Sequence, residues 1–300
     1  MKLLKVCIII VVTLIQGCTQ TPSENGEVPR SENLLNAINS AGVAFSYSGD
    51  HQQDFFKNPN RGYVSGYFYF EEDLANDIIF GLDMEWLEGV DDPVNFEGGD
   101  WMSLAGFTRE GILWFPIGSP ENLEGEPTDT EIWESRDLGK PLKPETWYKM
   151  TITSDFGARE FESVELQGGG LDTLIDLSGF PLEYPNFVSF DNPSLTFYMF
   201  ALRSKEFAPK NQGSFSVFFD DIKGGIWING NWEVVFSNGF ESQNQISDIP
   251  FTLPVSPRAI VQENFWYFEN EHAKINITDL NPRAGTKSME CHADLLDTNL

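Results

Sequence analysis

The chain has 300 residues, of which 25 are Phe and 8 are Trp, and its formal net charge is −27. A charge of this size repels nucleic acids and anionic lipid head groups, which excludes the protein classes that bind them through a basic surface. It favours neutral partners over polyanions, unless a cation or a local basic patch reverses the field. Aromatic residues suit sheet faces, and 26 Gly with 17 Pro supply turns, so an all-β protein is expected.

The N-terminus, MKLLKVCIIIVVTLIQGCTQ, places an apolar run from Val6 to Ile15 after two lysines. This run is shorter than the about 20 residues that span a bilayer, but it fits the core of a secretory signal. The phrase LIQGC, ending at Cys18, resembles the lipobox of bacterial lipoproteins, in which the cysteine is acylated, for example with palmitate. The resemblance implies a signal peptide over 1–17 and a lipid on Cys18 that anchors the protein to the membrane. The expected location is the cell envelope, at the outer membrane and exposed at the cell surface. The alternative is an ordinary leader with an incidental cysteine.

Residues 18–44 are expected to form a tether with one short helix. The first part, TQTPSENGEVPRSEN, is too polar to bury a core. In residues 32–41, ENLLNAINSA, the apolar side chains recur at helical spacing, with Ser31 as a candidate N-cap and Gly42 as a stop.

Strand-like runs separated by turn signals begin at Phe45 and predict an antiparallel sandwich rather than a parallel α/β fold. The runs cover 62–70, 78–87, 101–107, 112–117, 130–138, 146–156, 159–169, 194–203 and 214–222.

Three phrases in this region resemble the jelly roll of the concanavalin A-like lectins and glucanases. They are GYVSGYFYF near the start, PETWYKMTITSDF followed by REFESVEL, and SFSVFFDDIKGG at the close. The resemblance implies an all-β fold, an antiparallel β-sandwich of jelly-roll type, over residues 45–230. That fold hosts lectins, carbohydrate-binding modules, glycoside hydrolases and polysaccharide lyases, so it implies a fold more than a function.

Residues 231–300 are expected to form a partial second β-domain. The phrases VFSNGFES and NPRAGTKSMECHA resemble the opening strands of a family of β-sandwich carbohydrate-binding modules. About 70 residues are too few for a complete module of that kind. The alternative is that these strands complete the first sandwich.

The adjacent carboxylates of Asp220 and Asp221 are expected to point to opposite faces, because side chains alternate along a strand. A shared acid–base role is therefore not expected. Asp221 is a candidate ligand of a structural calcium ion, since Ca²⁺ prefers hard oxygen ligands. The alternative, which we favour, is an aspartate that caps a turn before Gly224.

Asp83 and Glu85 share one face of the expected strand 78–87, about 6.6 Å apart. Glycosidase carboxyls stand roughly 5 to 9.5 Å apart, so the spacing fits an enzyme. Family 16 glucanases, which share the jelly roll, carry E-x-D-x-E, but neither frame here supplies all three acids. Solvent-facing acids are the favoured interpretation. A lyase would need a base such as His51, and nothing in its surroundings marks it as one.

The function that we predict is non-catalytic binding of polysaccharide, most simply a neutral one, through an aromatic-lined face of the sandwich. The candidate binding residues are Trp86, Trp101, Trp114, Trp133 and Arg109. Two alternatives remain: a glycoside hydrolase or lyase using Asp83 and Glu85 or His51, and an envelope or adhesion protein without a small ligand.

Overall fold

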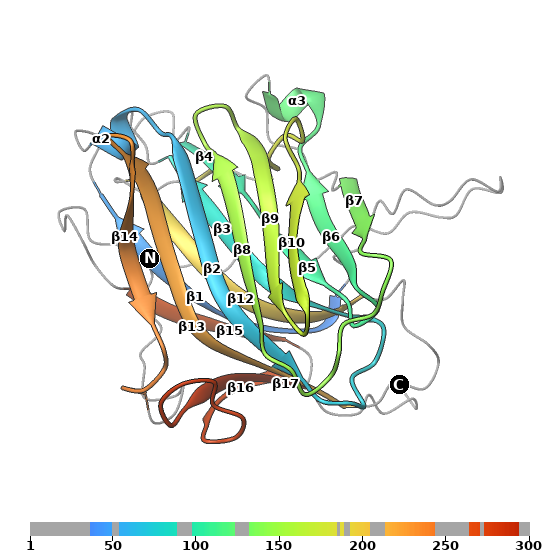
Figure 1. Cartoon of the computed structure of the whole chain (residues 1–300). Helices are drawn as coiled ribbons and strands as arrows, with labels where there is room; N and C mark the ends of the chain where they lie inside the picture. The colour runs from blue at the N-terminus through green and yellow to red at the C-terminus, as the bar shows by residue number, and fades with distance from the viewer. Residues whose placement is uncertain are drawn as a thin grey trace, which may run out of the picture.

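A computed structural model describes residues 37–49, 54–88, 98–123, 132–184, 187–188, 193–204, 214–243, 264–270 and 273–293. Nearly all of the regular structure in these residues is β, and the strands form two antiparallel sheets that pack face to face (Figure 1). The predicted signal peptide, Cys18 and the first part of the tether lie outside the described residues. No helix in the described ranges is long and apolar enough to cross a membrane.

The first sheet has nine strands, with the main order β15-β1-β12-β3-β5-β6-β7 and with β4 and β11 joined beside β3. Its strands are β1 (Ala37–Ser48), β3 (Ile78–Leu87), β4 (Gly98–Met102), β5 (Ala105–Phe107), β6 (Ile112–Ile117), β7 (Ile132–Asp137), β11 (Phe187–Val188), β12 (Ser194–Ser204) and β15 (Asn264–Asn270).

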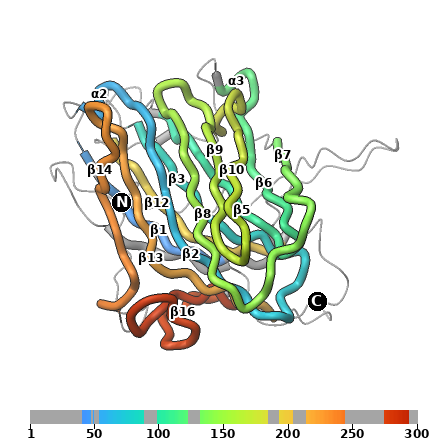
Figure 2. The backbone as a smooth tube through the Cα atoms, in the orientation of Figure 1, coloured from blue at the N-terminus to red at the C-terminus, as the bar shows by residue number. Residues whose placement is uncertain are grey.

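The second sheet has eight strands in the order β10-β9-β8-β2-β13-β17-β16, and β14 pairs with β13. Its strands are β2 (Arg61–Phe70), β8 (Tyr148–Asp155), β9 (Glu160–Gly168), β10 (Leu171–Asp176), β13 (Phe215–Ile228), β14 (Asn231–Asn238), β16 (Ala273–Thr278) and β17 (Ser288–Ala293). Two four-residue helices, α2 (Asp54–Lys57) and α3 (Pro120–Leu123), lie in loops. In Figure 2 the chain passes repeatedly between the two layers.

The core lies between the sheets and follows from the alternation of side chains along each strand. In β8, Tyr148, Met150 and Ile152 are buried while the residues between them are half-buried on the outer face. Phe68 of the second sheet meets Phe80 of the first, with ring centroids 4.9 Å apart. Full burial of one such side chain stabilises the fold by about 1.5–3 kcal/mol, so the core is a principal source of stability.

The expected all-β antiparallel sandwich is confirmed, and the predicted limits of two strands, 78–87 and 112–117, match β3 and β6. The short helix predicted over 32–41 is wrong where the structure describes it, because β1 begins at Ala37. This strand pairs with β12 on one side and β15 on the other, and those ladders outweigh a weak helical pattern.

A separate second domain from residue 231 is not what the structure shows for the described strands. β14 and β17 both pair with β13, and β15 pairs with β1. The described strands after residue 230 therefore join both sheets of the sandwich: β14, β15 and β17 pair with strands of the first 230 residues, and β16 pairs with β17. For the described strands this pairing favours the alternative, that they complete the first sandwich.

Candidate functional site

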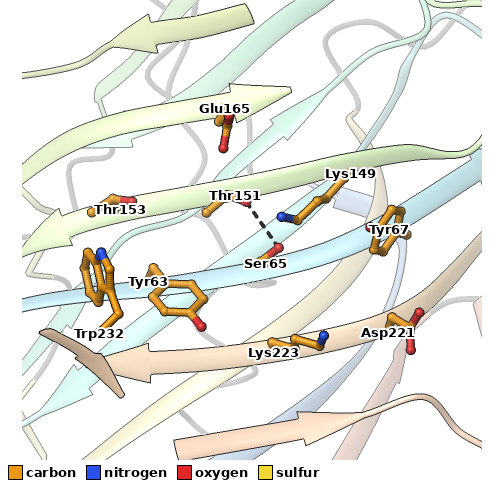
Figure 3. A pocket seen from close by; sticks show the side chains of 10 residues that line it. All are labelled: Tyr63, Ser65, Tyr67, Lys149, Thr151, Thr153, Glu165, Asp221, Lys223 and Trp232. Carbon is orange, nitrogen blue, oxygen red and sulfur yellow. Dashed lines mark hydrogen bonds between the residues drawn. The ribbon is translucent and has the colours of Figure 1, made fainter. Parts of the chain in front are cut away.

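The outer face of the eight-stranded sheet is hollowed into a cavity of about 400 Å³ over strands β2, β8 and β13. Figure 3 shows its lining, which combines aromatic rings with hydroxyls, two lysines and two acids. The lining residues are Tyr63, Ser65, Tyr67, Lys149, Thr151, Thr153, Glu165, Asp221, Lys223 and Trp232. We call this cavity the groove.

The groove exists because the outward positions of two neighbouring strands are polar or aromatic while their inward positions are apolar. Every second residue of β2 faces outward, and those from Arg61 to Tyr67 have partners on β8. Tyr63 lies opposite Thr153, Ser65 opposite Thr151, and Tyr67 opposite Lys149. Directly opposite side chains are close enough to touch, so the register alone assembles the floor.

Aromatic rings gather at one end of the groove. Trp232 of β14 meets Tyr63 edge to face at 5.0 Å and Trp227 at 5.1 Å. The Arg61 guanidinium lies 5.2 Å from the ring centroids of both tryptophans, a cation–π arrangement that holds them in place. Trp232 is 38% exposed, so its ring remains available to a ligand.

Tyr63 can pack closely against β13 because Gly225 stands beneath its ring. A Cβ atom at Gly225 would collide with the Tyr63 ring, and one at Gly224 would collide with the Phe197 ring in the core. The two glycines thus serve opposite faces of the sheet. Gly224 makes room for the core and Gly225 for the groove.

The other end of the groove is lined by Tyr67 and Asp221, and Arg283 contacts both. The Arg283 guanidinium lies 3.5 Å from the Tyr67 ring centroid and forms an ion pair with Asp221 at 2.5 Å. Asp221 has a φ of 49° and lies in a β-bulge between Asp220 and Lys223. A bulge adds a residue to one strand and breaks the alternation of its side chains.

This bulge corrects the expectation that Asp220 and Asp221 serve separate faces, because both contact the segment 283–284. Asp220 is buried and accepts hydrogen bonds from the backbone N–H groups of Arg283 and Ala284, at 3.0 and 3.2 Å. Burial raises the pKa of Asp220 to about 6. Asp220 therefore ties a loop to the sheet, while Asp221 holds Arg283 at the groove.

Asp221 as a calcium ligand stays a prediction. In the structure its carboxylate pairs with Arg283, which supplies the positive charge that a cation would bring. Within the described ranges, no group of three or more His, Cys, Asp or Glu side chains is arranged to hold a metal ion.

The floor between the two ends is polar. The Thr151 hydroxyl donates to Ser65 Oγ at 3.1 Å, and Gln167 Nε2 donates to Glu165 at 2.9 Å. Lys149 and Lys223 lie on opposite sides of β2, with Ser65 between them (Figure 3). Ring faces at the ends and hydroxyls and ammonium groups along the floor suit a flat, hydroxyl-rich ligand that is partly apolar.

No known family model matches the chain, and no curated protein matches it. Among solved structures, it is similar to an alginate lyase of polysaccharide lyase family 7, with 14% identity over 48% of this chain and 62% of that one, at a TM-score of 0.23. Scytalido-glutamic peptidase is 10% identical over 86% of this chain and 98% of its own, at 0.31. Peanut lectin is 16% identical over 58% of this chain and 81% of its own length, at a TM-score of 0.25. The chain thus spans about three fifths of the lyase. Similarities this remote carry no functional conclusion, so the site is interpreted from its own geometry.

Three of the four tryptophans predicted to bind carbohydrate are buried. Trp86 and Trp133 are 6% exposed and Trp101 is 1% exposed. Trp101 donates to Glu88 at 2.9 Å, and Trp86 packs against Phe156. These residues are part of the interior, because a large apolar ring gains most where it loses contact with water. They are not groove residues.

The remaining predicted binding residues lie away from the groove. Trp114 is partly buried on the nine-stranded sheet, beside a cluster that includes Trp133 and Phe200. The Arg109 guanidinium donates to the backbone carbonyls of Glu72 and Leu74, so its role in the structure is to hold that loop in place. The structure brings none of the five predicted binding residues into the groove.

Asp83 and Glu85 do share one face of β3, as expected, but the expectation that they face solvent is wrong. Both are at most 2% exposed and lie in a cluster with Asp100 and Tyr198, whose hydroxyl donates to Glu85. Burial raises the pKa of Glu85 to about 7 and raises the pKa values of Asp83 and Asp100 well above their usual range. His51 lies outside the described residues, so its role as a lyase base stays a prediction.

Of the residues that line the groove, only Asp221 was singled out from the sequence, as a candidate calcium ligand, because the other candidates were tryptophans and paired acids. A usable signal was present in GYVSGYFYF, where Tyr63, Ser65 and Tyr67 alternate with Val64, Gly66 and Phe68. Polar aromatic residues at every second position mark an outward face that is neither core nor ordinary solvent surface.

Proposed function

We propose that this protein binds a polysaccharide in the groove without cleaving it. The observation that supports the proposal is the lining itself: Tyr63, Tyr67 and Trp232 offer ring surfaces around a hydroxyl-bearing floor. Sugar rings present apolar C–H faces that stack on such rings, while their hydroxyls exchange hydrogen bonds with Ser and Thr. The rings are held in place by Arg61, Gly225 and Arg283, so little ordering is needed when a ligand binds.

Trp232→Ala tests this proposal in affinity electrophoresis of the protein through gels that contain a panel of polysaccharides. We expect at least one polysaccharide to retard the protein, and the variant to lose about tenfold or more in affinity, because an aromatic anchor on which a sugar ring stacks is lost. Leu174→Ala is the matched control, since Leu174 is 69% exposed on the same sheet but lies on β10, outside the groove. Retardation that is the same for both variants, or absent with every polysaccharide, would contradict the proposal.

The proposal includes anchorage of the protein to the cell envelope through a lipid on Cys18, at the outer membrane and facing outward. The support is the LIQGC phrase at the end of the apolar run in the sequence. Metabolic labelling with radioactive palmitate should mark the wild-type protein and the control Cys7→Ser, because Cys7 would be removed with the signal peptide. Cys18→Ser should lose the label and appear in the soluble fraction. Label that persists in Cys18→Ser would rule the anchor out.

A further inference from the structure

The groove carries two lysines whose charges are not balanced by an ion pair. Among the described residues, no carboxylate lies within ion-pair distance of Lys149 or Lys223, whereas Arg61 is paired with Glu162 and Arg283 with Asp221. The chain has a formal net charge of −27, yet two of its basic residues line the groove without an ion-pair partner among the described residues.

The acids near these lysines do not cancel them. Asp221 is engaged by Arg283, and Glu162 by Arg61. Glu165, which lies opposite Thr151, accepts a hydrogen bond from Gln167 and is the one lining carboxylate without a cation. When the Asp221–Arg283 ion pair is set aside, the charged groups that remain in the lining are the ammonium groups of Lys149 and Lys223 and the carboxylate of Glu165. The local balance is positive, against the sign of the whole chain.

The register places the two ammonium groups to act on one ligand. Lys223 lies opposite Ser65 on one side of β2, and Lys149 lies opposite Tyr67 on the other side. Their strands, β13 and β8, flank β2 and are therefore about 9.5 Å apart. Along β2 the two lysines are offset by two residues, or about 6.6 Å, because one lies opposite Ser65 and the other opposite Tyr67. A chain of sugar residues that runs over β2 between the Trp232 and Tyr67 ends would pass between the two lysines (Figure 3).

We infer that the ligand of the groove is an anionic saccharide, one whose sugars bear carboxylate or sulfate groups. This inference rests on the proposed function and specifies its ligand class. Lysine offers three N–H donors and no acceptor, and an ionised acid group offers acceptors alone, so the two are complementary. Charge-assisted hydrogen bonds are roughly twice as strong as neutral ones. The expectation of a neutral partner came from the net charge of the whole chain. That charge sets the electrostatic potential far from the protein, whereas the lysines set it inside the groove.

The experiment compares four polymers in affinity electrophoresis of the full chain: polygalacturonate, its fully methyl-esterified form, dextran sulfate and dextran. The double variant Lys149→Gln/Lys223→Gln removes both charges and keeps side chains that form hydrogen bonds. Lys274→Gln is the matched control, because Lys274 is an exposed lysine of the same sheet on β16, outside the groove.

We expect polygalacturonate or dextran sulfate to retard the wild type and Lys274→Gln at least tenfold more strongly than the matching neutral polymer. The comparison of the two anions identifies carboxylate or sulfate as the recognised group. The double variant should lose this preference and bind the anion no better than the neutral polymer. Equal retardation by charged and neutral polymers, or an unchanged anion preference in the double variant, overturns the anionic class while leaving polysaccharide binding intact. Retardation by none of the polymers, charged or neutral, counts against the proposed function itself and against this inference with it.

Discussion

At the scale of single residues, two kinds of buried acid behave differently in this protein. Asp220 is buried but accepts hydrogen bonds from three backbone N–H groups, those of Asp221, Arg283 and Ala284. Both oxygens of Asp100 are buried without a hydrogen-bond partner beside Asp83 and Glu85. The hydrogen bonds of Asp220 stabilise a loop. The cluster of Asp83, Glu85 and Asp100 instead brings three carboxyl groups together in the protein interior, where the low dielectric constant disfavours their charged forms.

Asp220→Ala should destabilise the protein far more than the neighbouring Asp221→Ala. The first change leaves three backbone donors without their acceptor and should lower the free energy of unfolding by about 2–4 kcal/mol. The second removes a partly exposed ion pair, which contributes about 0–1 kcal/mol. Urea denaturation of both variants measures the difference. Equal losses would mean that the loop is not held by Asp220.

The acid cluster predicts that stability falls as the pH rises through the acidic range. The pKa of Glu85 is about 7 in the folded state against an ordinary value of 4.5, so between these values the folded protein binds more protons than the unfolded chain. Stability therefore decreases with rising pH across this window, and Asp83 and Asp100 act in the same direction.

Asp100→Asn tests this pH dependence. It removes one of the buried charges and supplies donors to its neighbours, so it should raise the free energy of unfolding at pH 8 by about 1–3 kcal/mol. The gain should shrink at pH 5, where the cluster is already protonated. Urea denaturation at both pH values measures it, with the exposed Asp172→Asn as a control that should change neither. A gain of the same size at both pH values would show that charge is not the cause.

At the scale of elements, β13 serves the core and the groove at the same time. Its Phe215–Phe219 part pairs with β17, and its Ile222–Ile228 part pairs with β14, while β2 lies along its other edge. The bulge at Asp220 to Lys223 lies where the pairing changes from one partner to the other. The strand runs six residues beyond the predicted limit of residue 222 because Gly224 and Gly225 continue the ladder rather than end it.

Alanine at the two glycines should separate the two roles of β13. Gly224→Ala presses on Phe197 in the core and Gly225→Ala presses on Tyr63 in the groove, and each should cost about 1–3 kcal/mol of unfolding free energy as overpacking. Only Gly225→Ala should also weaken polysaccharide retardation at a temperature where both variants are folded. Thermal unfolding and affinity electrophoresis give the two measurements. A loss of binding in Gly224→Ala alone would reverse the assignment.

At the scale of the whole molecule, the last strands of the chain belong to the same sandwich as the first. β15 extends the nine-stranded sheet beside β1, and β17 lies beside β13 in the other sheet. Cys291 of β17 is fully buried and its thiol lies 3.3 Å from the carbonyl of Ala41, 250 residues earlier in the sequence. The two ends of the described chain are therefore packed in the same core.

Removal of residues 264–300 should abolish the folded state rather than release an intact first domain. The truncation exposes the edges of β1 and β13 and uncovers the core around Ala41 and Phe215. We expect the full chain to unfold in one transition in urea, and the truncated chain to lack any cooperative transition and to be digested rapidly by protease. A truncated protein that unfolds cooperatively would restore the two-domain interpretation.

The general plan of this protein was predictable from sequence because alternation of apolar and polar residues is a local property. The strands at 78–87 and 112–117 were found to the residue, and the antiparallel sandwich followed from their spacing. The candidate site was not found, because whether a tryptophan faces the core or a ligand depends on which strand lies beside it. Trp101 and Trp232 have similar local surroundings in sequence, yet one is 1% and the other 38% exposed.

The strand pattern, the strong negative charge and the lipobox-like phrase at Cys18 can be recognised in the sequence, since each depends on neighbouring residues or on composition. The pairing of β17 with β13, the burial of Asp83 and Glu85, and the meeting of Tyr63, Lys149 and Lys223 in one groove follow only from the folded structure. The cause of this difference is strand register. Sheet pairing joins residues that are far apart in the chain, and it sets which side chains share a face, a neighbour and a charge environment.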